Sequence, residues 1–434
     1  RGDARARPST SRRDDDDERE KTPIPKPYPK PYPGPPLNPT LNPILVHHGW
    51  TGVSRASRPR ALAATMPDSH ADDSDDHHLP VVCVFGSVNV DHAFRCATAL
   101  PRPGETVGNA TYARAPGGKG ANQACAAART TSAVVRDARE EPVTRRGCRV
   151  EFVGCVGAHD AYSLAALRDA GVGTSRARTC EDGDTGTACV LVDANGENCI
   201  AVAPGVNARV NGDDVPRCEV LCAQCEVPAR ANARAIARAR ALNPDVRVML
   251  NYAPANAVDW GLILSASTVC VNETELAVLR DAYAARSKNL GVKASECFLN
   301  TLVVTRGARP AQETTVPEDI ATSAEARLDW LLKPECRDGD AFFRQRVDIR
   351  AENLEVNPER IVDTVGAGDA FVGAYCASWA MNDSAETRLR IASAAGTLAC
   401  LEPGARPKSI TDARERAREV KVGNTIPLHP SPSS

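Results

Sequence analysis

Two glycine-rich segments of this chain carry residues that could perform chemistry. The first, DTVGAGDAF, runs from Asp363 to Phe371, and the second, APGGKGANQ, covers residues 115–123. Glycines leave backbone N–H groups uncovered, and an apolar run after a glycine turn indicates the start of a helix. The free N–H groups and the dipole of a helix start attract an anion. Both segments therefore predict ligand-binding turns at the N-termini of helices.

The aspartate that directly follows the first turn is unexpected, because a carboxylate repels a bound anion. Asp369 comes after Gly366, Ala367 and Gly368. A structural explanation is available, since carboxylates at a helix start cap the helix and stabilise it by about 1 kcal/mol. Taken alone, the segment favours this capping role, and a catalytic role needs support from other polar residues of the chain.

Neither glycine-rich segment matches the common nucleotide-binding fingerprints. In the second segment, Lys119 is followed by Gly120 rather than by Ser or Thr, so it is not a P-loop of the Walker A type. In the first segment, Phe371 stands where a dinucleotide-binding turn has its third glycine. An NAD-dependent oxidoreductase is therefore disfavoured.

A third polar group comes from the segment SVNVDH, where Asn89 and Asp91 stand at the end of the first predicted strand. Strand alternation places both side chains on the same side, where they could bind vicinal hydroxyls of a ligand. The alternative is a turn that only ends the strand.

The elements that would position these residues follow a simple alternation. Short β-branched runs, which include VVCVFGSV, VRVMLNY and NTLVVTRG, alternate with alanine-rich helical stretches such as ARANARAIARARAL. This pattern predicts an α/β fold with a central, mostly parallel sheet flanked by helices, and ligands at the carboxyl ends of the strands. A hairpin signal at Asn195-Gly196 interrupts the alternation. We expect a small antiparallel β lid from about residues 93–116 and 184–205.

Composition favours a small-molecule partner in a reducing compartment. The 434 residues are 42% apolar with a net charge of -2, and the interspersed charges disfavour nucleic acid and membrane partners. No run of eighteen apolar residues exists to span a membrane. The 16 cysteines stand mostly singly in apolar runs, which indicates core packing. The one C-x-x-C pair, Cys222 and Cys225, favours packing over metal or redox use. We expect an intracellular, most simply cytoplasmic, protein.

Three parts of the chain are expected along its length. Residues 1–78 are acidic and proline-rich, which predicts a disordered extension, either a targeting segment, for example to a plastid, or a non-native one with Met66 as the true start. Residues 79–422 form the folded domain, with surface insertions at about 130–148 and 309–350. Residues 423–434 form a flexible tail.

In their order, these motifs resemble the ribokinase and PfkB family of carbohydrate kinases. The resemblance covers about residues 80–412 and includes GSVNVDH, GGKGANQACAAAR, LNYAPA, VNETE, VTRGA, DTVGAGDAF and GARPKS. It implies a ribokinase-like fold, a homodimer formed through the lid, and ATP-dependent phosphorylation of D-ribose at the 5-hydroxyl. Phosphoryl transfer depends on alignment and charge stabilisation, so Asp369 need not be a strong base to orient and deprotonate this hydroxyl.

The resemblance also assigns roles to individual residues. Asp369 would be the base, and Gly366, Ala367 and Gly368 would form the anion hole. The sugar would be held by Asn89, Asp91, Gly118, Lys119, Gly120, Asn122, Glu226 and Asp369. ATP would lie along Asn272, Thr305, Arg306, Gly307, Gly368 and Ser393, with Mg²⁺ organised through water by Glu275.

A monovalent cation, K⁺, is a further implication. It would be held by Asp363 and by the carbonyls of Val365, Ala399, Glu402 and Gly404. Lys408 stands where the family has a serine, so its ammonium group could replace the cation, or the alignment slips by one residue and Ser409 takes the place. We favour the slip or a retained K⁺ site.

Two other functions are alternatives to this one. Another PfkB-type kinase could act on fructose, 2-keto-3-deoxygluconate or a nucleoside such as adenosine. A catalytically silent relative that serves as a scaffold would be expected to lose the base or the glycines, and this chain retains both.

Overall fold

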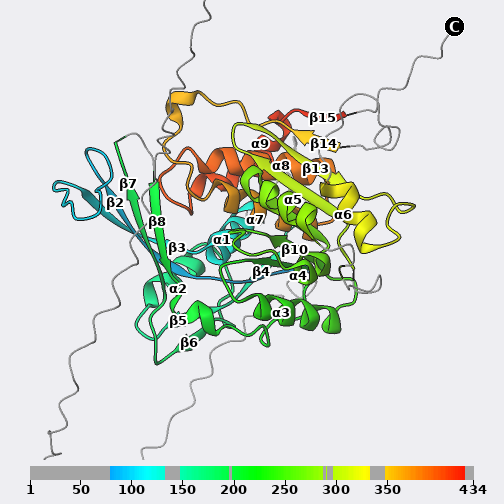
Figure 1. The fold of residues 1–434 in the computed structure, drawn as a ribbon, viewed down its shortest axis with the longest axis horizontal. Helices are drawn as coiled ribbons and strands as arrows, with labels where there is room; N and C mark the ends of the chain where they lie inside the picture. Colours follow the sequence, from blue (N-terminus) through cyan, green and yellow to red (C-terminus); the bar gives the residue numbers. More distant parts are fainter. Residues whose placement is uncertain are drawn as a thin grey trace, which may run out of the picture. The chain divides into compact units, whose positions relative to one another are not determined.

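A computed structural model describes residues 79–131, 147–194, 198–286, 290, 297–332 and 348–425 (Figure 1). The expected extension at residues 1–78, most of the expected insertion at 130–148 and the end of the tail lie outside these residues. Within them, nine strands form one sheet in the order β15-β14-β13-β12-β11-β10-β9-β1-β4. The strands are β1 (Val81–Phe85), β4 (Arg149–Val153), β9 (Val220–Gln224), β10 (Arg247–Asn251), β11 (Thr268–Asn272), β12 (Thr301–Arg306), β13 (Arg309–Thr315), β14 (Asp348–Ala351) and β15 (Val422–Thr425).

The strands from β4 to β12 pair in parallel, as the alternation of strands and helices predicts. Both faces of this sheet are buried, which explains why its strands are apolar at successive positions. In β1, Val82 and Val84 pack into one core, whereas Cys83 and Phe85 pack into the other. The expected mainly parallel α/β fold is confirmed.

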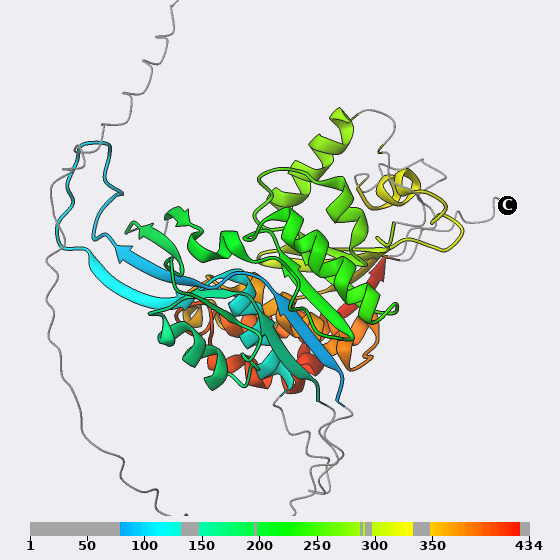
Figure 2. The ribbon, with the colours of Figure 1, turned by 90° about the horizontal axis from the view of Figure 1, so that it is seen from below.

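The helices form one layer on each face of the sheet (Figure 2). One core contains residues of α1 (Lys119–Thr131), α2 (Ala161–Asp169), α7 (Ala367–Ala380), α8 (Ala385–Ala399) and α9 (Ala413–Arg416). The other contains residues of α3 (Ala229–Leu242), α4 (Trp260–Ser265), α5 (Glu273–Ala285) and α6 (Ala324–Leu332). Short 3-10 turns lie at η2 (Gly205–Arg209), η5 (Pro358–Arg360), η6 (Lys408–Asp412) and η7 (Ala417–Glu419).

A smaller sheet projects from this body and has the strand order β3-β2-β7-β8. Its strands are β2 (Asn89–Arg95), β3 (Thr111–Gly117), β7 (Gly186–Val192) and β8 (Asn198–Ala203). The pairs β2–β3 and β7–β8 are antiparallel, as expected, whereas β2 and β7 pair in parallel and join the two chain segments. We call this sheet the lid. A separate ribbon, β5 (Cys155–Gly157) and β6 (Arg178–Cys180), lies between its two segments in the chain.

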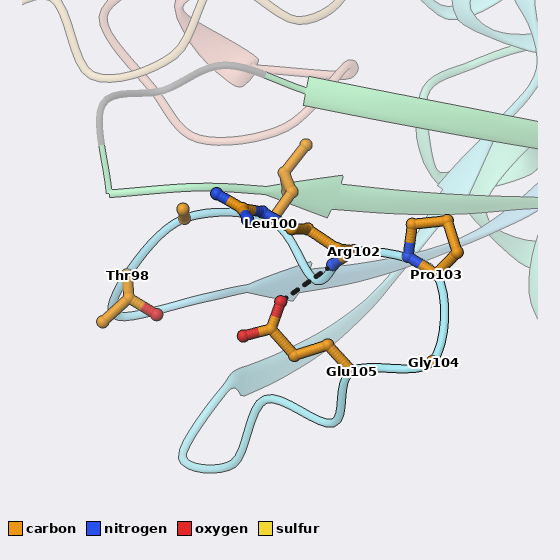
Figure 3. Close-up of a pocket in the computed structure, with 7 residues that line it drawn as sticks. Thr98, Leu100, Arg102, Pro103, Gly104 and Glu105 are labelled. Carbon is orange, nitrogen blue, oxygen red and sulfur yellow. Dashed lines mark hydrogen bonds between the residues drawn. The ribbon is translucent and has the colours of Figure 1, made fainter. Parts of the chain in front are cut away.

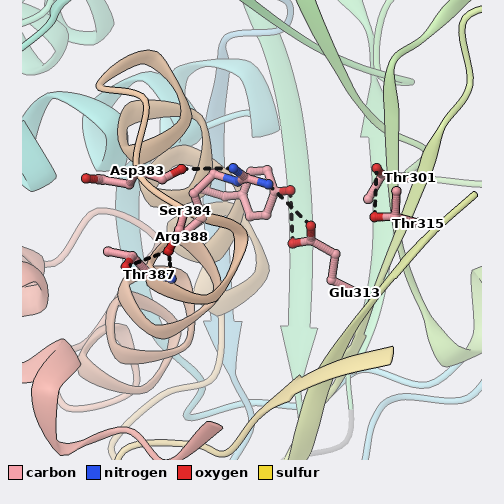
Figure 4. A network of polar contacts seen from close by, with 8 residues as sticks. Thr301, Glu313, Thr315, Asp383, Ser384, Thr387 and Arg388 are labelled. Carbon is pink, nitrogen blue, oxygen red and sulfur yellow. Dashed lines mark hydrogen bonds and ion pairs between the residues drawn. The ribbon is translucent and has the colours of Figure 1, made fainter. Parts of the chain in front are cut away.

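We expected residues 309–350 to be a surface insertion, and this expectation is wrong at both ends of the range. Residues 309–315 form β13, which pairs with β12, and residues 348–351 form β14. The charge that suggested a surface segment is partly internal: Glu313 is 2% exposed and contacts Arg388 of α8 and Tyr375 of α7 (Figure 4). Burial raises the pKa of Glu313, while Arg388 opposes this shift.

The expected flexible tail is also corrected at its start. Residues 422–425 form β15, which pairs antiparallel with β14 at the edge of the main sheet. The 15 cysteines within the described residues are all free, and Cys222 is fully buried, in agreement with a packing role. In the same residues no helix has the length and apolar character needed to cross a membrane.

Candidate active site

A cavity opens at the carboxyl ends of β10, β11 and β12, where the parallel sheet predicts a ligand. The start of α1 and the start of α7 close it from the other side. Seven of the expected site residues line it: Lys119, Asn272, Glu275, Thr305, Gly366, Gly368 and Asp369. Four lining residues were not expected: Asn251, Ala253, Cys270 and Val372.

Asp369 lies in the first turn of α7 and is held by two amide side chains of α1. Asn122 Nδ2 donates to Asp369 Oδ2 at 3.0 Å, and Gln123 Nε2 donates to Asp369 Oδ1 at 3.0 Å. The aspartate is 7% exposed, so water covers little of it. Its carboxylate therefore has one defined orientation toward the cavity.

Gln123 is a site residue that the sequence reasoning missed. Its side-chain nitrogen also donates to Asn251 Oδ1 at 3.0 Å, and its oxygen accepts from Cys222 Sγ at 3.3 Å. Every polar atom of this fully buried amide is therefore satisfied, which fixes its rotation. A glutamine within an alanine-rich buried helix is the signal that could have indicated it.

Two glycines allow the helices to bring these groups together. Gly366 caps α7 with φ 79°, and a Cβ there would lie 2.5 Å from Ala405 Cα. Gly373, seven residues further along α7, faces α1 so closely that a Cβ would lie 2.3 Å from Gln123 O. Because no side chain intervenes, α7 packs directly on α1, and Asp369 reaches the amides.

The turn before α7 ends at Gly366, and within it Ala367 N donates to Thr364 O at 3.3 Å. Gly366 caps the helix without a side-chain hydrogen bond, and Ala370 N–H is the first to bond back to it, at 2.8 Å from Gly366 O. The first turn of any helix has N–H groups without intrahelical partners. A Cβ on Gly368 would meet no atom within 4 Å, so the space in front of this residue is open.

The second glycine-rich segment runs from the last residue of β3 into the first turn of α1, and we call residues 117–122 the sugar loop after the role that the family resemblance predicts for them. Glu226 Oε2 accepts from Lys119 N at 2.9 Å and from Ser87 Oγ at 2.6 Å, so it ties this loop to the end of β1. Gly118 has φ 88°, and a Cβ there would lie 2.6 Å from Asn89 N. Only glycine fits this crossing.

Charges gather at the sugar loop. The pKa of Lys119 is raised, chiefly by Asp369, although burial opposes the shift. Burial raises the pKa of Asp91 to about 6, and Glu226 adds to the shift. Burial also raises the pKa of Glu275. The site thus combines several carboxylates with one lysine within electrostatic reach of the expected base.

Asn89 and Asp91 lie at the start of β2 and not at the end of β1, so that expectation is wrong in detail. The chain turns after Phe85 and enters the lid, where β2 pairs with β3. Asn89 Oδ1 accepts from Asn207 Nδ2 at 2.9 Å, and Asp91 faces Gly117, where an added Cβ would lie 2.0 Å from its Oδ2. Both residues stand where the lid meets the sugar loop.

The residues expected along a nucleotide are only partly brought together. Asn272 caps α5, with Glu275 N donating to its Oδ1 at 2.8 Å, while Glu275 Oε2 accepts from Asn272 N at 2.8 Å. Thr305 lines the cavity beside them. Arg306 donates to Gln312, and Gly307 lies in the turn between β12 and β13.

Ser393 does not join the cavity. It lies within α8, is 2% exposed, and belongs to the interior of the molecule. Its expected contact with ATP rested on the family resemblance alone, and the helical repeat of α8 directs its side chain inward.

The residues expected around a cation form one cluster beside the α7 turn. Asp363 Oδ1 accepts from Val365 N at 3.0 Å, and its Oδ2 accepts from Gly404 N at 3.1 Å. Val362 N donates to Cys400 O at 2.8 Å, which places the segment after Ala399 alongside. Arg95 of the lid lies 3.7 Å from Asp363 Oδ2.

Lys408 and Ser409, beside this cluster, differ in where their side chains lie. The Lys408 side chain is exposed, while Ser409 Oγ donates to Leu398 O at 2.9 Å. Glu402 accepts both backbone N–H groups, from Lys408 and from Ser409, at 2.9 Å. Ser409 therefore faces the end of α8, and the lysine does not.

A second pocket lies at the loop that connects β2 to β3 (Figure 3). It is formed by the loop from Thr98 to Glu105, where Arg102 N donates to Glu105 Oε2 at 3.0 Å. None of the expected site residues lines it. Within the ranges that the structure describes, no cluster of three or more His, Cys, Asp or Glu side chains could hold a metal ion.

Known proteins resemble the chain over most of its length. A ribokinase from Haemophilus influenzae is 27% identical over 335 residues, which cover 74% of this chain and 92% of that protein. The solved structure of an Arabidopsis thaliana ribokinase, complexed with ribose and ATP, superposes with a TM-score of 0.58 at 23% identity, covering 78% of this chain and 99% of that one. A ribokinase structure from Thermotoga maritima gives the same TM-score and identity, covering 98% of its own chain.

The model of the pfkB family of carbohydrate kinases matches residues 80–316 and 339–412. The match contains both glycine-rich segments, the residues that line the cavity and β13, and it leaves out residues 317–338. The chain is a member of the pfkB family of carbohydrate kinases.

Proposed function

We propose that the protein transfers the γ-phosphoryl group of ATP to the 5-hydroxyl of D-ribose, giving ribose 5-phosphate. The proposal rests on one arrangement above all: Asp369, fixed by Asn122 and Gln123, shares a cavity with Lys119 and the open turn at Gly368. A hydroxyl bound between the sugar loop and Asp369 would stand in front of the α7 turn. This is the alignment that in-line phosphoryl transfer requires.

Asp369 is the base in this proposal. Its fixed carboxylate orients the acceptor hydroxyl and takes its proton as the bond to phosphorus forms. The N–H groups of Gly366, Ala367 and Gly368 stabilise negative charge on the transferred group. Because the carboxylates that line the site repel the phosphates, the nucleotide must bind together with a cation or contact Lys119.

The sugar in this proposal binds where the lid meets the sugar loop. Asp91 accepts hydrogen bonds from vicinal hydroxyls together with Asn89, and Asn122, Glu226, Gly118 and Gly120 shape the loop beneath them. This supports ribose because paired hydroxyls suit paired oxygen and amide groups. Deoxyribose, fructose, 2-keto-3-deoxygluconate and adenosine are the competing acceptors.

The nucleotide lies in this proposal over Asn272 and Thr305, with Arg306 and Gly307 at its edge. Mg²⁺ would be held through water by the Glu275 oxygen that is not engaged with Asn272 N, and by the phosphates. The metal would neutralise charge on the phosphates. The residues fit this role because a carboxylate and an amide oxygen stand together at the cavity.

We also propose that K⁺ binds beside Asp363. The proposal is supported by the position of Asp363, which accepts hydrogen bonds from the backbone N–H groups of Val365 and Gly404, two of the residues whose carbonyls would bind the ion. In this proposal Ser409, rather than Lys408, takes the place of the serine that the family has near the cation. If the midpoint of thermal unfolding is the same in KCl and NaCl, and activity is equal in both, the cation proposal fails.

A homodimer through the lid is part of the same proposal. Tyr112 of β3 and Ile200 and Val202 of β8 are more than half exposed, at 54%, 55% and 52%. Their strands are the two edges of the lid sheet, where a second copy could pair. Sedimentation of the full chain and of an Ile200→Lys variant tests this, and a monomer at micromolar concentration in both contradicts it.

The test of function is an acceptor panel with the full chain. Release of ADP is measured with ribose, deoxyribose, fructose and adenosine, and the site of phosphorylation on the product is read by phosphorus NMR. Ribose turnover with phosphate on the 5-oxygen supports the proposal. Rapid turnover of fructose or adenosine without ribose rejects ribose as the acceptor, and ATP binding without any turnover supports a silent binding protein.

A further inference from the structure

The turn after α8 touches both parts of the site. In this turn, which we call the 404–406 turn, Gly404 N donates to Asp363 Oδ2 at 3.1 Å. Its next residue, Ala405, lies against Gly366, where no Cβ would fit. Its last residue, Arg406, extends in the other direction, toward the sugar loop. The turn therefore lies between the phosphate-binding end of α7 and the expected sugar site.

Arg406 makes two hydrogen bonds that the family likeness did not suggest. Its Nε donates to Asn122 Oδ1 at 2.9 Å, and its Nη2 donates to Gly117 O at 2.8 Å. A guanidinium group presents donors in a rigid fork, so it can hold a side chain and a backbone carbonyl at once. The carbonyl belongs to the last residue of β3, where the lid joins the sugar loop.

The contact with Asn122 fixes which end of its amide faces Asp369. An asparagine side chain has an oxygen acceptor on one side and an NH₂ donor on the other. Because Arg406 occupies the oxygen, the NH₂ group points at Asp369 Oδ2, at 3.0 Å. Without the guanidinium, the amide could rotate and set its oxygen against the carboxylate.

Arg406 also adds a second cation to Lys119 within electrostatic reach of Asp91. Its positive charge lowers the pKa of Asp91, against the larger effects of burial and of Glu226. Burial lowers the pKa of Arg406 itself. Arg129 of α1 holds the residue that follows the turn, because its Nη1 donates to Pro407 O at 3.0 Å.

We propose that Arg406 is a positioning residue, which holds Asn122 in the orientation that serves Asp369 and ties the sugar loop to the turn at the start of α7. The inference rests on the proposed function for its kinetic consequence. Its structural consequence, an ordered sugar loop, does not depend on which acceptor is phosphorylated.

The first experiment tests the tie without any substrate. Amide hydrogen exchange is compared between the full-length wild type and Arg406→Gln, with Arg418→Gln as the matched control, since Arg418 is exposed and contacts Glu415. Faster exchange in peptides that cover residues 115–124 is expected in Arg406→Gln alone. Unchanged exchange there overturns the proposal, even if the protein proves to be a kinase.

The second experiment separates orientation from charge. With the acceptor that the wild type phosphorylates, Arg406→Gln is expected to lose about 10- to 100-fold in kcat/KM, because misplacement of about 1 Å has effects of this size. In the profile of kcat/KM against pH, the fall in activity on the acidic side should move to higher pH in Arg406→Gln, because loss of the positive charge raises the pKa of Asp91. We call this fall the acidic limb. Arg406→Lys keeps the charge but not the fork, so it should lose rate and keep the limb. Added guanidinium should restore part of the rate of Arg406→Ala.

These outcomes distinguish the inference from the proposed function. If the wild type phosphorylates no acceptor, the proposed function fails, and the exchange experiment alone decides the role of Arg406. If Arg406→Gln is folded and keeps kcat/KM and its pH limb, the inference fails while the function stands. If both Arg406→Gln and Arg406→Lys lose cooperative unfolding, Arg406 is a structural residue and the positioning role is rejected.

Discussion

Asn122 Nδ2 donates to Asp369 Oδ2 at 3.0 Å, although 247 positions separate the two residues in the chain. The contact joins the two glycine-rich segments, one at the start of α1 and one at the start of α7. An aspartate that only capped its helix would bond to the N–H groups of its own first turn. Asp369 instead accepts from side chains of another helix, which favours a role at the cavity.

Replacing Asp369 by Asn is expected to abolish most of the turnover. The substitution keeps the shape of the side chain but removes the proton acceptor, so kcat should fall about 10²- to 10⁴-fold. The affinity for the acceptor, measured by calorimetry, should change little. Asp319→Asn, at an exposed position, is the matched control. Near-normal turnover of Asp369→Asn would remove Asp369 from the mechanism.

Activity should fall as the pH drops through about 6. Asp91, whose pKa is raised to about 6, accepts hydrogen bonds from the acceptor only when it is ionised. The profile of kcat/KM against pH reports groups of the free enzyme, so it should show this limb. In Asp91→Asn the limb should vanish. A limb that persists unchanged in this variant belongs to another group.

The same pKa has a consequence for stability with the opposite sign to that of most aspartates. The folded pKa of about 6 exceeds the ordinary 3.8, so the folded state holds this proton more tightly than the unfolded state. Ionised Asp91 therefore opposes folding above pH 6, and this effect fades as the pH falls from 6 to 4. Asp91→Asn should raise the melting temperature at pH 7 more than at pH 4.

Gly366→Ala should damage both stability and activity. The residue has φ 79°, where an L side chain adds about 1–2 kcal/mol of strain, and its Cβ would also lie 2.5 Å from Ala405 Cα. Gly171→Ala is the control, because Gly171 has φ 85° with nothing within 4 Å of an added Cβ. Denaturant unfolding should show strain in both variants, and loss of turnover in Gly366→Ala alone.

Gly373→Ala tests the packing of α7 on α1. An added Cβ would lie 2.3 Å from Gln123 O, so the helices must separate, at about 1–3 kcal/mol. The amides of α1 would then withdraw from Asp369, and kcat should fall. Gly261→Ala in α4 meets only Asp259 Oδ1, at 3.4 Å, so it should be neutral or stabilising by about 1 kcal/mol. Equal activity of the two variants would contradict this account.

Much of the fold could be predicted from local pattern. The runs VVCVFGSV and NTLVVTRG became β1 and β12, and the glycine turn at 366–368 became the start of α7, because these signals depend on neighbours in the chain. Seven expected residues meet in the cavity for the same reason, since each stands at the end of a strand or the start of a helix.

The remaining features depend on tertiary contacts that leave no local signal. Glu313 looks like a surface residue until Arg388, 75 positions away, satisfies it in the interior. The side chains of Gln123 and Arg406 each contact a residue that is distant in the chain, Asp369 and Asn122 respectively. Ser393 was placed by likeness alone, and its helix turns it inward.

The lid is built from two chain segments that are joined by the parallel pairing of β2 with β7, from Asn89 and Gly186 to Arg95 and Val192. Neither segment can swing outward alone without breaking the main-chain hydrogen bonds of this seam. Opening of the lid would therefore require a rotation of the whole sheet about its junctions with the body. A molecule enclosed beneath it would escape at a rate governed by that single collective motion, and not by the fraying of a loop.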